Sequence, residues 1–450
     1  MTVLCLDIGS TWTKGSLVSP AGDLLGTAQH TTTPPEVLRG IDSVAGELGP
    51  AEQVLACSSA GGGLRLAVVG QERLISAEAG YRVALSAGAK VVHVSTGPLD
   101  GAGVRALRAA KPDLVLLVGG TDGGDASVLL HNARRLGANR IACPVVLAGN
   151  ADAQPEAAEL LRGRTVVRTA NVLPDVGELA PGPARAAIRE VFLEHVIGGK
   201  GLSRGRRFRG LVRAVTPDAV LRGVSRLAMR DREGAVLVVD VGGATTDVYS
   251  AVSTVEGTGR AVALPPDRRT VEGDLGMRWS APGVVAEAVA EKLVDRAEAA
   301  VLRAEADARA ADVTWLPDDP AVDLRLAALA AVLAIRRHLR LVDGRLGPRG
   351  AGLLVLSGGV FRHAASTADV ERVLLADPVL RPFLRTADIA VDRDYALAPA
   401  GLLAGIGRPE AADRLLTSVL APATASGTEP VTEPGAGTAA TGTTTAPGAR

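Results

Sequence analysis

Two aspartates that each follow an apolar run are the residues whose type and setting could do chemistry. Val236 to Val239 is an unbroken apolar run that stops at Asp240, and a short polar turn follows it, made of Gly242, Gly243, Thr245, Thr246 and Asp247. Glycines let backbone N–H groups approach an anion closely, and hydroxyl groups donate to phosphate oxygens. A carboxylate at a strand end can hold hydrated Mg2+ or polarise a water. The turn therefore indicates nucleotide-phosphate chemistry.

The same arrangement occurs near the N-terminus. Val3 to Leu6 is a short apolar run that ends at Asp7, and the turn leads to Lys14 through Gly9, Ser10 and Thr11. One such turn is a weak signal, because Gly and Asp are ordinary turn residues. Two copies roughly half a chain apart favour a site built from two halves of the molecule.

A third turn has small residues between an apolar run and a helical pattern. Leu353 to Leu356 leads into Ser357, Gly358 and Gly359. Small residues at this point let a flat ring such as adenine approach the backbone. A nucleotide could therefore be bound by all three turns together.

In this order the turns resemble the phosphate-1, phosphate-2 and adenosine motifs of the actin-like ATPase superfamily, which includes sugar kinases, Hsp70 chaperones and actin. The matching segments are 7–14, 240–247 and 356–360. The resemblance implies a two-lobed α/β fold of the ribonuclease H-like type that binds ATP with Mg2+. It implies that Asp7 and Asp240 flank the metal through water, with Asp240 also a candidate to orient the attacking water. Lys14 would neutralise β-phosphate charge, Gly9–Thr11 and Gly242–Thr246 would cradle phosphates, and Gly358 and Gly359 would face the adenosine.

Composition sets the wider limits. The 450 residues are 47% hydrophobic but only 2% aromatic, and the formal net charge is zero. That balance gives no electrostatic reason to expect a nucleic acid or an acidic membrane as partner. Three widely spaced cysteines without a CxxC pair indicate neither a disulfide framework nor a zinc site. With no leader-like segment and no apolar stretch of membrane-spanning length, we expect a cytoplasmic protein.

Along the chain, the pattern predicts a first ATPase lobe over 1–63, with strands near 3–8, 14–19, 23–29 and 53–57 and a helix near 35–48. From 64 to 200, strands near 90–96, 113–118, 144–148 and 165–168 alternate with helices near 76–88, 101–110, 125–137 and 153–162. This alternation predicts βαβ units and an inserted parallel α/β module, the expected specificity element. Its glycine-rich strand exit at 117–125 could cradle a second ligand, but a turn before a helix capped by Asp125 is favoured.

A second lobe is predicted over 201–375. It contains the second and third turns, a loop near 271–278 with solvated carboxylates, one long amphipathic helix over 284–312 and another over 321–341. A return segment at 376–420 has a strand near 387–392 and a small-residue connecting helix at 395–405, whose start Pro399 leaves uncertain. Residues 421–450 are Thr, Ala, Gly and Pro without periodicity, which predicts a disordered tail.

Longer motifs narrow the resemblance. LDIGSTWTKG, SSAGGGLR, LLVGGTDGGD, ANVLPDVG, VDVGGATTDV and EGDLGMRW together resemble the glutamate mutase L family, abbreviated MutL or GlmL and unrelated to the mismatch-repair protein of similar name. The resemblance covers roughly residues 1–410. It implies an ATP-dependent reactivating chaperone that acts on the subunits of an adenosylcobalamin-dependent mutase, glutamate mutase or an aminomutase. The base-off cobalamin signature Asp-x-His-x-x-Gly is absent, which indicates a helper protein and not the mutase itself.

Two other functions stay open. A small-molecule kinase would need a general base, for which Asp122 and Asp125 are candidates. A filament-forming or purely structural actin-like protein would polymerise with ATP. Homo-oligomerisation and the identity of the mutase are also left open by the sequence.

Overall fold

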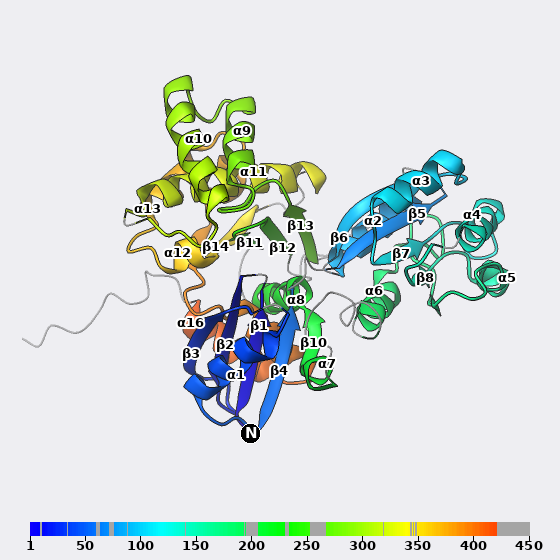
Figure 1. The fold of residues 1–450 in the computed structure, drawn as a ribbon, viewed down its shortest axis with the longest axis horizontal. Helices are drawn as coiled ribbons and strands as arrows, with labels where there is room; N and C mark the ends of the chain where they lie inside the picture. The colour runs from blue at the N-terminus through cyan, green and yellow to red at the C-terminus, as the bar shows by residue number, and fades with distance from the viewer. Residues whose placement is uncertain are drawn as a thin grey trace, which may run out of the picture.

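The computed structural model describes residues 1–9, 11–33, 35–59, 64–71, 76–87, 89–139, 141–192, 194, 206–229, 234–252, 267–317, 319–342, 344, 346 and 349–420. Three five-stranded sheets organise these residues. Figure 1 shows one sheet at the bottom, in blue, a second above it in green and yellow, and a third to the right in blue and cyan. Ser10 and the predicted tail at 421–450 lie outside the described residues.

The first sheet begins with the expected hairpins. Strands β1 (Val3–Ile8), β2 (Trp12–Val18) and β3 (Leu24–Thr31) pair antiparallel in succession, and β4 (Gln53–Ser58) lies parallel to β1. Helix α1 (Val37–Leu48) packs Ile41 and Val44 into the same core as Leu4 and Leu6 of β1. Leu4 and Leu6 face α1 together because every second residue of a strand faces the same side.

The second sheet repeats this topology. Strands β11 (Ala235–Val241), β12 (Thr246–Ala251) and β13 (Asp267–Glu272) pair antiparallel, while β14 (Ala351–Ser357) and β15 (Asp388–Val391) are parallel to β11. The sheet orders are β10-β4-β1-β2-β3 and β13-β12-β11-β14-β15. Two sheets of three hairpin strands followed by parallel strands confirm the predicted two-lobed α/β fold.

The third sheet is the predicted parallel module. Its order is β6-β5-β7-β8-β9, and all its pairs are parallel. The strands are β5 (Arg65–Gly70), β6 (Lys90–Thr96), β7 (Leu114–Leu117), β8 (Val145–Leu147) and β9 (Val166–Arg168). The helices between and after them are α2 (Ser76–Ser86), α3 (Gly101–Ala109), α4 (Ser127–Ala138), η1 (Ala151–Ala153), α5 (Gln154–Leu160) and α6 (Pro181–Val191). The sequence did not predict β5 and α6.

Two helices cross between the first and second sheets. Helices α8 (Thr216–Ala228) and α15 (Leu397–Gly405) approach so closely that a Cβ on Gly401 would lie 1.8 Å from the carbonyl oxygen of Ala219. Their apolar side chains share one core with the facing strands, including Val3 of β1 and Val236 of β11. Pro399 lies in the first turn of α15, where its missing N–H breaks no helical hydrogen bond, so the expected connecting helix forms.

The division between the lobes follows strand pairing. Helix α7 (Arg206–Leu211) leads into β10 (Val212–Val215), which pairs with β4 of the first sheet. We therefore propose that the second lobe begins after α8, later than the boundary at residue 201 that the sequence suggests. The third sheet, whose helices cover both of its faces, fits the predicted inserted module at 64–200, and that boundary stays a prediction.

One predicted helix is wrong. The expected single helix over 284–312 is two helices, α9 (Ala281–Ala290) and α10 (Arg296–Ala311). Lys292 adopts a positive φ of 58°, and the amide of Leu293 donates to the carbonyl of Ala288, which ends the first helix. Asp295 then caps the second helix by accepting from the amide of Glu298. Apolar periodicity continued across the break, and it concealed these local signals.

The remaining helices complete the second lobe and its return segment. Helix α11 (Ala321–Leu341) forms over the predicted residues. It runs against the outer face of the second sheet, and its buried residues share a core with Leu237 and Val239. The others are α12 (Gly359–Arg362), α13 (Ala368–Ala376), α14 (Arg381–Leu384) and α16 (Pro409–Val419). Among the described residues, no helix combines the length and apolar character needed to cross a membrane.

Candidate functional site

Strand alternation directs Asp7 and Asp240 to the same layer. Asp7 lies on the face of β1 that carries Val3 and Cys5, and Asp240 lies on the face of β11 that carries Val236 and Val238. Those four apolar residues belong to the single core between the two sheets. Both carboxylates therefore point into the interlobe layer at the carboxyl ends of their strands.

The charges of both carboxylates act on Lys14. Its Nζ is 4.0 Å from Oδ2 of Asp7, its cross-strand partner, and 3.7 Å from the centroid of the Tyr395 ring. Burial lowers the pKa of Lys14, but Tyr395 and the charges of Asp7, Asp240 and Asp392 outweigh burial and leave that pKa raised. The structure thus brings the three residues predicted as catalytic into one electrostatic cluster, together with Asp392.

Asp7 is held by two groups that the sequence did not reveal. The hydroxyl of Thr216, at the start of α8, donates to Oδ1 of Asp7 at 2.6 Å. The Cys57 thiol lies 3.6 Å from the same oxygen, and burial raises the pKa of that thiol far enough to keep it protonated. Thr216 therefore fixes the orientation of the carboxylate and links it to the first turn of a crossing helix.

The phosphate-1 turn closes on itself. The amide of Gly9 donates to the carbonyl of Trp12 at 2.9 Å, and a Cβ on Gly9 would lie 2.8 Å from that oxygen. Thr32 braces the turn, since its hydroxyl donates to the carbonyl of Gly9 and its amide to the carbonyl of Thr11. Only glycine fits at position 9 without a shift of the backbone. The predicted contribution of Ser10 lies outside the described residues.

The phosphate-2 turn presents a row of amides. The carbonyl of Gly242 accepts from the amide of Met277, and that of Gly243 accepts from the amides of Arg278 and Trp279. The carbonyl of Ala244 accepts from the Ser280 hydroxyl at 2.9 Å.

In a trans peptide the C=O of one residue and the N–H of the next point in opposite directions. The amides of Gly243, Ala244 and Thr245 therefore point away from residues 277–280, and no acceptor for them is found within the described part of the chain. Successive amides turned the same way form an anion-binding concavity.

The two threonines of this turn differ in placement. Thr245 lies on the side of Asp247, to which its hydroxyl donates at 3.3 Å. Thr246 is fully buried and is opposite Val241, whose side chain belongs to the outer core of the second lobe. Its hydroxyl finds no partner among the described residues. Thr245 is therefore placed better than Thr246 to donate to a phosphate.

The adenosine turn lies beside β11. Gly358 has φ of 117°, and a Cβ there would lie 2.3 Å from the carbonyl oxygen of Val241. Gly359 begins α12, at whose end Arg362 lies over the Tyr395 ring with its guanidinium carbon 4.3 Å from the centroid. Arg362 also donates to the Thr27 hydroxyl of the first sheet at 3.4 Å. Tyr395 and Arg362 therefore connect the two lobes between the adenosine turn and Lys14.

Asp240 and Asp392 have perturbed acidities. Burial raises the pKa of Asp240 to about 6, and the opposing charge of Lys14 only partly offsets that effect. Burial also raises the pKa of Asp392 to about 6, although the backbone amide of Ala396 donates to this carboxylate at 2.7 Å. Strongly shifted carboxyl groups next to a cation are typical of sites that handle protons or anions.

The carboxylates fit hydrated Mg2+ better than a metal bound directly by protein. Within the described residues, no group of three or more His, Cys, Asp or Glu side chains is close enough to hold a metal ion. Magnesium usually keeps several waters and takes one or two carboxylates together with phosphate oxygens. Asp7 and Asp240 are the residues that would hold it, and the ion would neutralise phosphate charge.

Four residues of this cluster escaped the sequence analysis: Thr216, Arg362, Asp392 and Tyr395. Asp392 follows the apolar run at 389–391, as Asp7 and Asp240 follow theirs, so the same signal could have found it. Tyr395 has a positive φ of 52°, which no sequence pattern shows for a non-glycine residue. Arg362 becomes relevant only when the lobes are placed together. Thr216 becomes relevant only when β10 pairs with β4 and brings the start of α8 to Asp7.

The glycine-rich loop of the inserted module is braced by its own side chains. Asp122 accepts from the amide of Ala151 and from the Asn171 side chain, each at 2.8 Å. Asp125 accepts from the amide and the hydroxyl of Ser127. Ala126, and not Asp125, is the N-cap of α4, which corrects the predicted cap. Both carboxylates therefore have structural partners, as the favoured turn interpretation predicts.

The chain is similar in sequence to known proteins over most of its length. The sequence profile of a family described as "MutL protein" matches residues 3–420. A protein of Clostridium tetanomorphum named "Protein MutL" is 31% identical, and the alignment covers 93% of this chain and 98% of that protein. Family similarity therefore extends over all three sheets.

Solved structures are similar only at a low level. Nucleotide-free acetone carboxylase has a TM-score of 0.36 at 14% identity, covering 89% of this chain and 70% of that one. Xylulose kinase from Rhodospirillum rubrum has 0.35 at 16% identity, covering 93% and 97%. The activator of 2-hydroxyisocaproyl-CoA dehydratase from Clostridium difficile, with bound ADPNP, has 0.30 at 11% identity, covering 93% and 97%.

Proposed function

The chain belongs to the MutL protein family, and from that premise we propose that it is an ATP-dependent reactivating chaperone for an adenosylcobalamin-dependent mutase. In this proposal it binds ATP with Mg2+ between its two lobes. Hydrolysis changes how the two lobes close on each other. This change in conformation drives the exchange of damaged cofactor on mutase subunits of the glutamate mutase or aminomutase type.

One observation carries the nucleotide part of the proposal. Two hairpins of the same design, one from each lobe, direct Asp7 and Asp240 into a shared layer where both act on Lys14. Beside them, three successive amides of the phosphate-2 turn are without a described acceptor. Carboxylates for a hydrated cation, a lysine and free amides are what positioning and neutralising a triphosphate require.

The roles within the site follow from these positions. Lys14 neutralises phosphate charge, Asp7 and Asp240 hold hydrated Mg2+, and Asp240 orients the water that attacks. The Asp240 pKa near 6 leaves this carboxylate largely ionised at neutral pH, so that it accepts a hydrogen bond from water. Gly358 and Gly359 receive the nucleoside, and Thr216 keeps Asp7 aligned.

The chaperone part depends on how lobe closure is transmitted. A nucleotide shifts a conformational equilibrium only through different affinities for the two states. Here the site spans both lobes, and α8 and α15 cross between them with glycine at the contact. The inserted module, joined to both lobes, is the element we propose for contact with the mutase subunits.

The test is ATP hydrolysis by the pure protein with and without cobalamin-inactivated glutamate mutase. We expect slow hydrolysis that the inactivated mutase stimulates, together with recovery of mutase activity when free adenosylcobalamin is supplied. Active mutase holding intact cofactor is the matched control and should stimulate less. Hydrolysis that neither form of the mutase changes would contradict the chaperone role.

The other two functions predict different outcomes. A small-molecule kinase would consume ATP only with an acceptor, and a filament former would sediment after ATP addition. The kinase has less support, because Asp122 and Asp125 are occupied in bracing a loop of the inserted module. In Figure 1, helix α4, which follows that loop, lies on the side of the module away from β11.

A further inference from the structure

The segment from Gly273 to Ser280, here called the 273–280 loop, covers the phosphate-2 turn. Its backbone and the Ser280 hydroxyl supply the donors that hold the carbonyls of Gly242, Gly243 and Ala244. The approach is so close that a Cβ on Gly276 would lie 2.5 Å from the carbonyl carbon of Ala244. Since each held carbonyl turns the following amide the other way, the loop sets the direction of the anion-binding amides.

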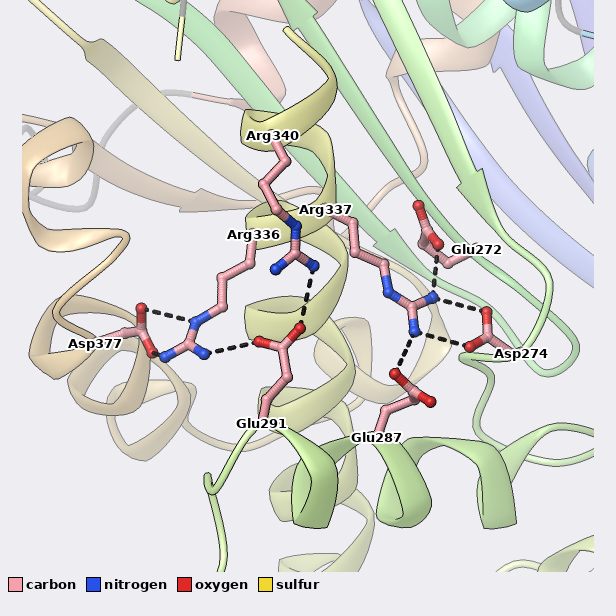
Figure 2. A network of polar contacts seen from close by, with 8 residues as sticks. All are labelled: Glu272, Asp274, Glu287, Glu291, Arg336, Arg337, Arg340 and Asp377. Carbon is pink, nitrogen blue, oxygen red and sulfur yellow. Dashed lines mark hydrogen bonds and ion pairs between the residues drawn. The ribbon is translucent and has the colours of Figure 1, made fainter. Parts of the chain in front are cut away.

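Arg337 binds the start of this loop and the helix that follows it. From near the C-terminal end of α11 its guanidinium binds Glu272 at 2.7 Å, at the end of β13, and binds Asp274 through two nitrogens at 2.9 Å each. It also binds Glu287 of α9 at 2.8 Å. Figure 2 shows the three carboxylates around this one guanidinium, with the loop running between β13 and α9.

The charges make this arrangement dependent on Arg337. The hydrogen bonds from Arg337 hold the pKa of Asp274 below its usual range, while burial raises the pKa of Glu272. Without the guanidinium, three carboxylates would face one another in a partly buried setting, and like charges there repel. The loop would then have to move to separate them.

The inserted module contacts the same loop. Lys90 begins β6, and its Nζ lies 2.6 Å from the point where a Cβ of Gly273 would be. Its charge also helps to lower the pKa of Asp274. Elsewhere along β13, Arg185 of α6 forms an ion pair with Asp267 at 3.2 Å. The module is therefore joined by charged contacts to the strand and loop that carry the phosphate-2 turn.

We propose that Arg337 is a positioning residue for the phosphate-2 turn, and that the 273–280 loop connects this turn to the inserted module through Lys90. The inference rests on the proposed function only for the identity of the anion, an ATP phosphate. Through this connection, an anion bound at the phosphate-2 turn changes the dynamics of the inserted module near Lys90. Arg337 acts through the loop and does not touch the nucleotide.

Arg336 is a matched control on the same helix. It is more buried than Arg337, with 11% against 21% of its side chain exposed. It forms ion pairs with Glu291 at 2.8 Å and Asp377 at 2.6 Å. Figure 2 shows Asp377 on the other side of α11 from the loop and Glu291 in front of that helix. Its loss should cost stability without a change in the phosphate-2 turn.

The first experiment compares Arg337→Gln with Arg336→Gln by hydrogen exchange in the nucleotide-free protein. We expect Arg337→Gln to speed exchange about tenfold or more at 277–279, whose amides donate to the carbonyls of the phosphate-2 turn, and to weaken Mg-ATP binding by about tenfold, as small misplacements of positioning groups do. Arg337→Lys should recover part of both effects. Arg336→Gln should lower thermal stability and change neither. Equal exchange at 277–279 in the two Gln variants would overturn the positioning role.

The second experiment tests the connection to the module. Adding Mg-ATP to the wild-type protein should slow exchange at 242–246 and also at 90–96. Lys90→Gln should abolish the change at 90–96 and keep the change at 242–246, while Lys111→Gln, in a loop of the same module, should keep both. A persistent response at 90–96 in Lys90→Gln would refute the connection. An absent response at 242–246 in wild type would instead refute ATP binding, and the nucleotide-free comparison would still decide the role of Arg337.

Discussion

Asp7 and Asp240 occupy equivalent positions in two hairpins of one design. Each is the last residue but one of a buried strand, and in each case the glycine two residues later donates its amide to the carbonyl three residues beyond it, Trp12 or Thr245, at 2.9 Å. A Cβ on either glycine would lie within 3.0 Å of that carbonyl oxygen. The two turns are therefore alike in backbone geometry as well as in sequence.

The hairpins differ at the residue opposite the aspartate. Asp7 is opposite Lys14, whereas Asp240 is opposite Asp247. Asp247 is neutralised by Arg269, which is 5% exposed and 2.5 Å away. At this position the first lobe therefore contributes the cation Lys14 to the interlobe layer, and the second lobe contributes the backbone amides of the phosphate-2 turn. A triphosphate placed there would meet a different kind of positive partner from each lobe.

Asp240→Asn should keep the fold and lower ATP hydrolysis by at least about a hundredfold, because a neutral amide neither orients the attacking water nor holds hydrated Mg2+ as a carboxylate does. Steady-state phosphate release measures the effect. Mg-ATP binding should persist through Lys14 and the amides. Unchanged turnover would remove Asp240 from the mechanism.

The same variant should change how stability depends on pH. The folded-state pKa of Asp240 is about 6, above the ordinary value, so the folded protein binds this proton more tightly than the unfolded chain does. Its contribution to the free energy of unfolding therefore falls as pH rises from about 4 to about 6 and is constant above. Asp240→Asn should lack this slope and should be more stable than wild type at neutral pH by about 1–2 kcal/mol. Thermal unfolding across this pH range measures the difference.

Much of the fold could be predicted because the hydrophobic period changes clearly along the chain. The three N-terminal strands, four of the five module strands and α11 were expected near their observed bounds. Strand β10 was missed because it is short and Arg213 interrupts its apolar residues, and it becomes a strand by pairing with β4. The break between α9 and α10 depends on Lys292 and Asp295, whose local signals the continuous apolar period concealed.

The candidate site was predictable only where one stretch of sequence contains the whole motif. Asp7, Lys14 and Asp240 are in such stretches, and the structure brings their charges together. Tyr395 and Thr216 reach the cluster from segments that are far from those motifs in sequence. Glu272 and Asp274 were interpreted as solvated, whereas Arg337 from α11 binds both. Contacts of this kind depend on tertiary packing, which a single sequence does not display.

Tyr395→Ala should weaken Mg-ATP binding several-fold and lower the free energy of unfolding by about 1–2 kcal/mol, because the ring holds the cations of Lys14 and Arg362. Without the ring, Lys14 would lose the contact that keeps it in the interlobe layer. Tyr395→Phe keeps the ring and should change neither quantity. Calorimetric titration and thermal unfolding test both. Tighter binding by Tyr395→Ala would show that the ring blocks the nucleotide.

Gly358→Ala should destabilise the protein by about 2 kcal/mol or more, since φ of 117° and a Cβ only 2.3 Å from the backbone of Val241 are both unfavourable for alanine. Its neighbour provides the control. In Gly359→Ala the new Cβ would meet the Tyr395 hydroxyl at an ordinary 3.8 Å, so stability should stay within about 0.5 kcal/mol. Denaturant unfolding of both variants measures the contrast, and equal stabilities would mean that the adenosine turn is not held against β11.

Gly401→Ala should separate the crossing helices. A Cβ at residue 401 would lie 1.8 Å from the carbonyl oxygen of Ala219, which is backbone and cannot rotate away as a flexible side chain could. We expect a loss of about 2–4 kcal/mol in the free energy of unfolding, as overpacking of a close contact produces. Gly46→Ala in α1, where nothing lies within 4 Å, should instead stabilise by about 0.5–1 kcal/mol. Because α8 also carries Thr216, which holds Asp7, Gly401→Ala should weaken Mg-ATP binding as well. Normal ATP affinity together with the lost stability would show that α8 holds Asp7 in place independently of its contact with α15.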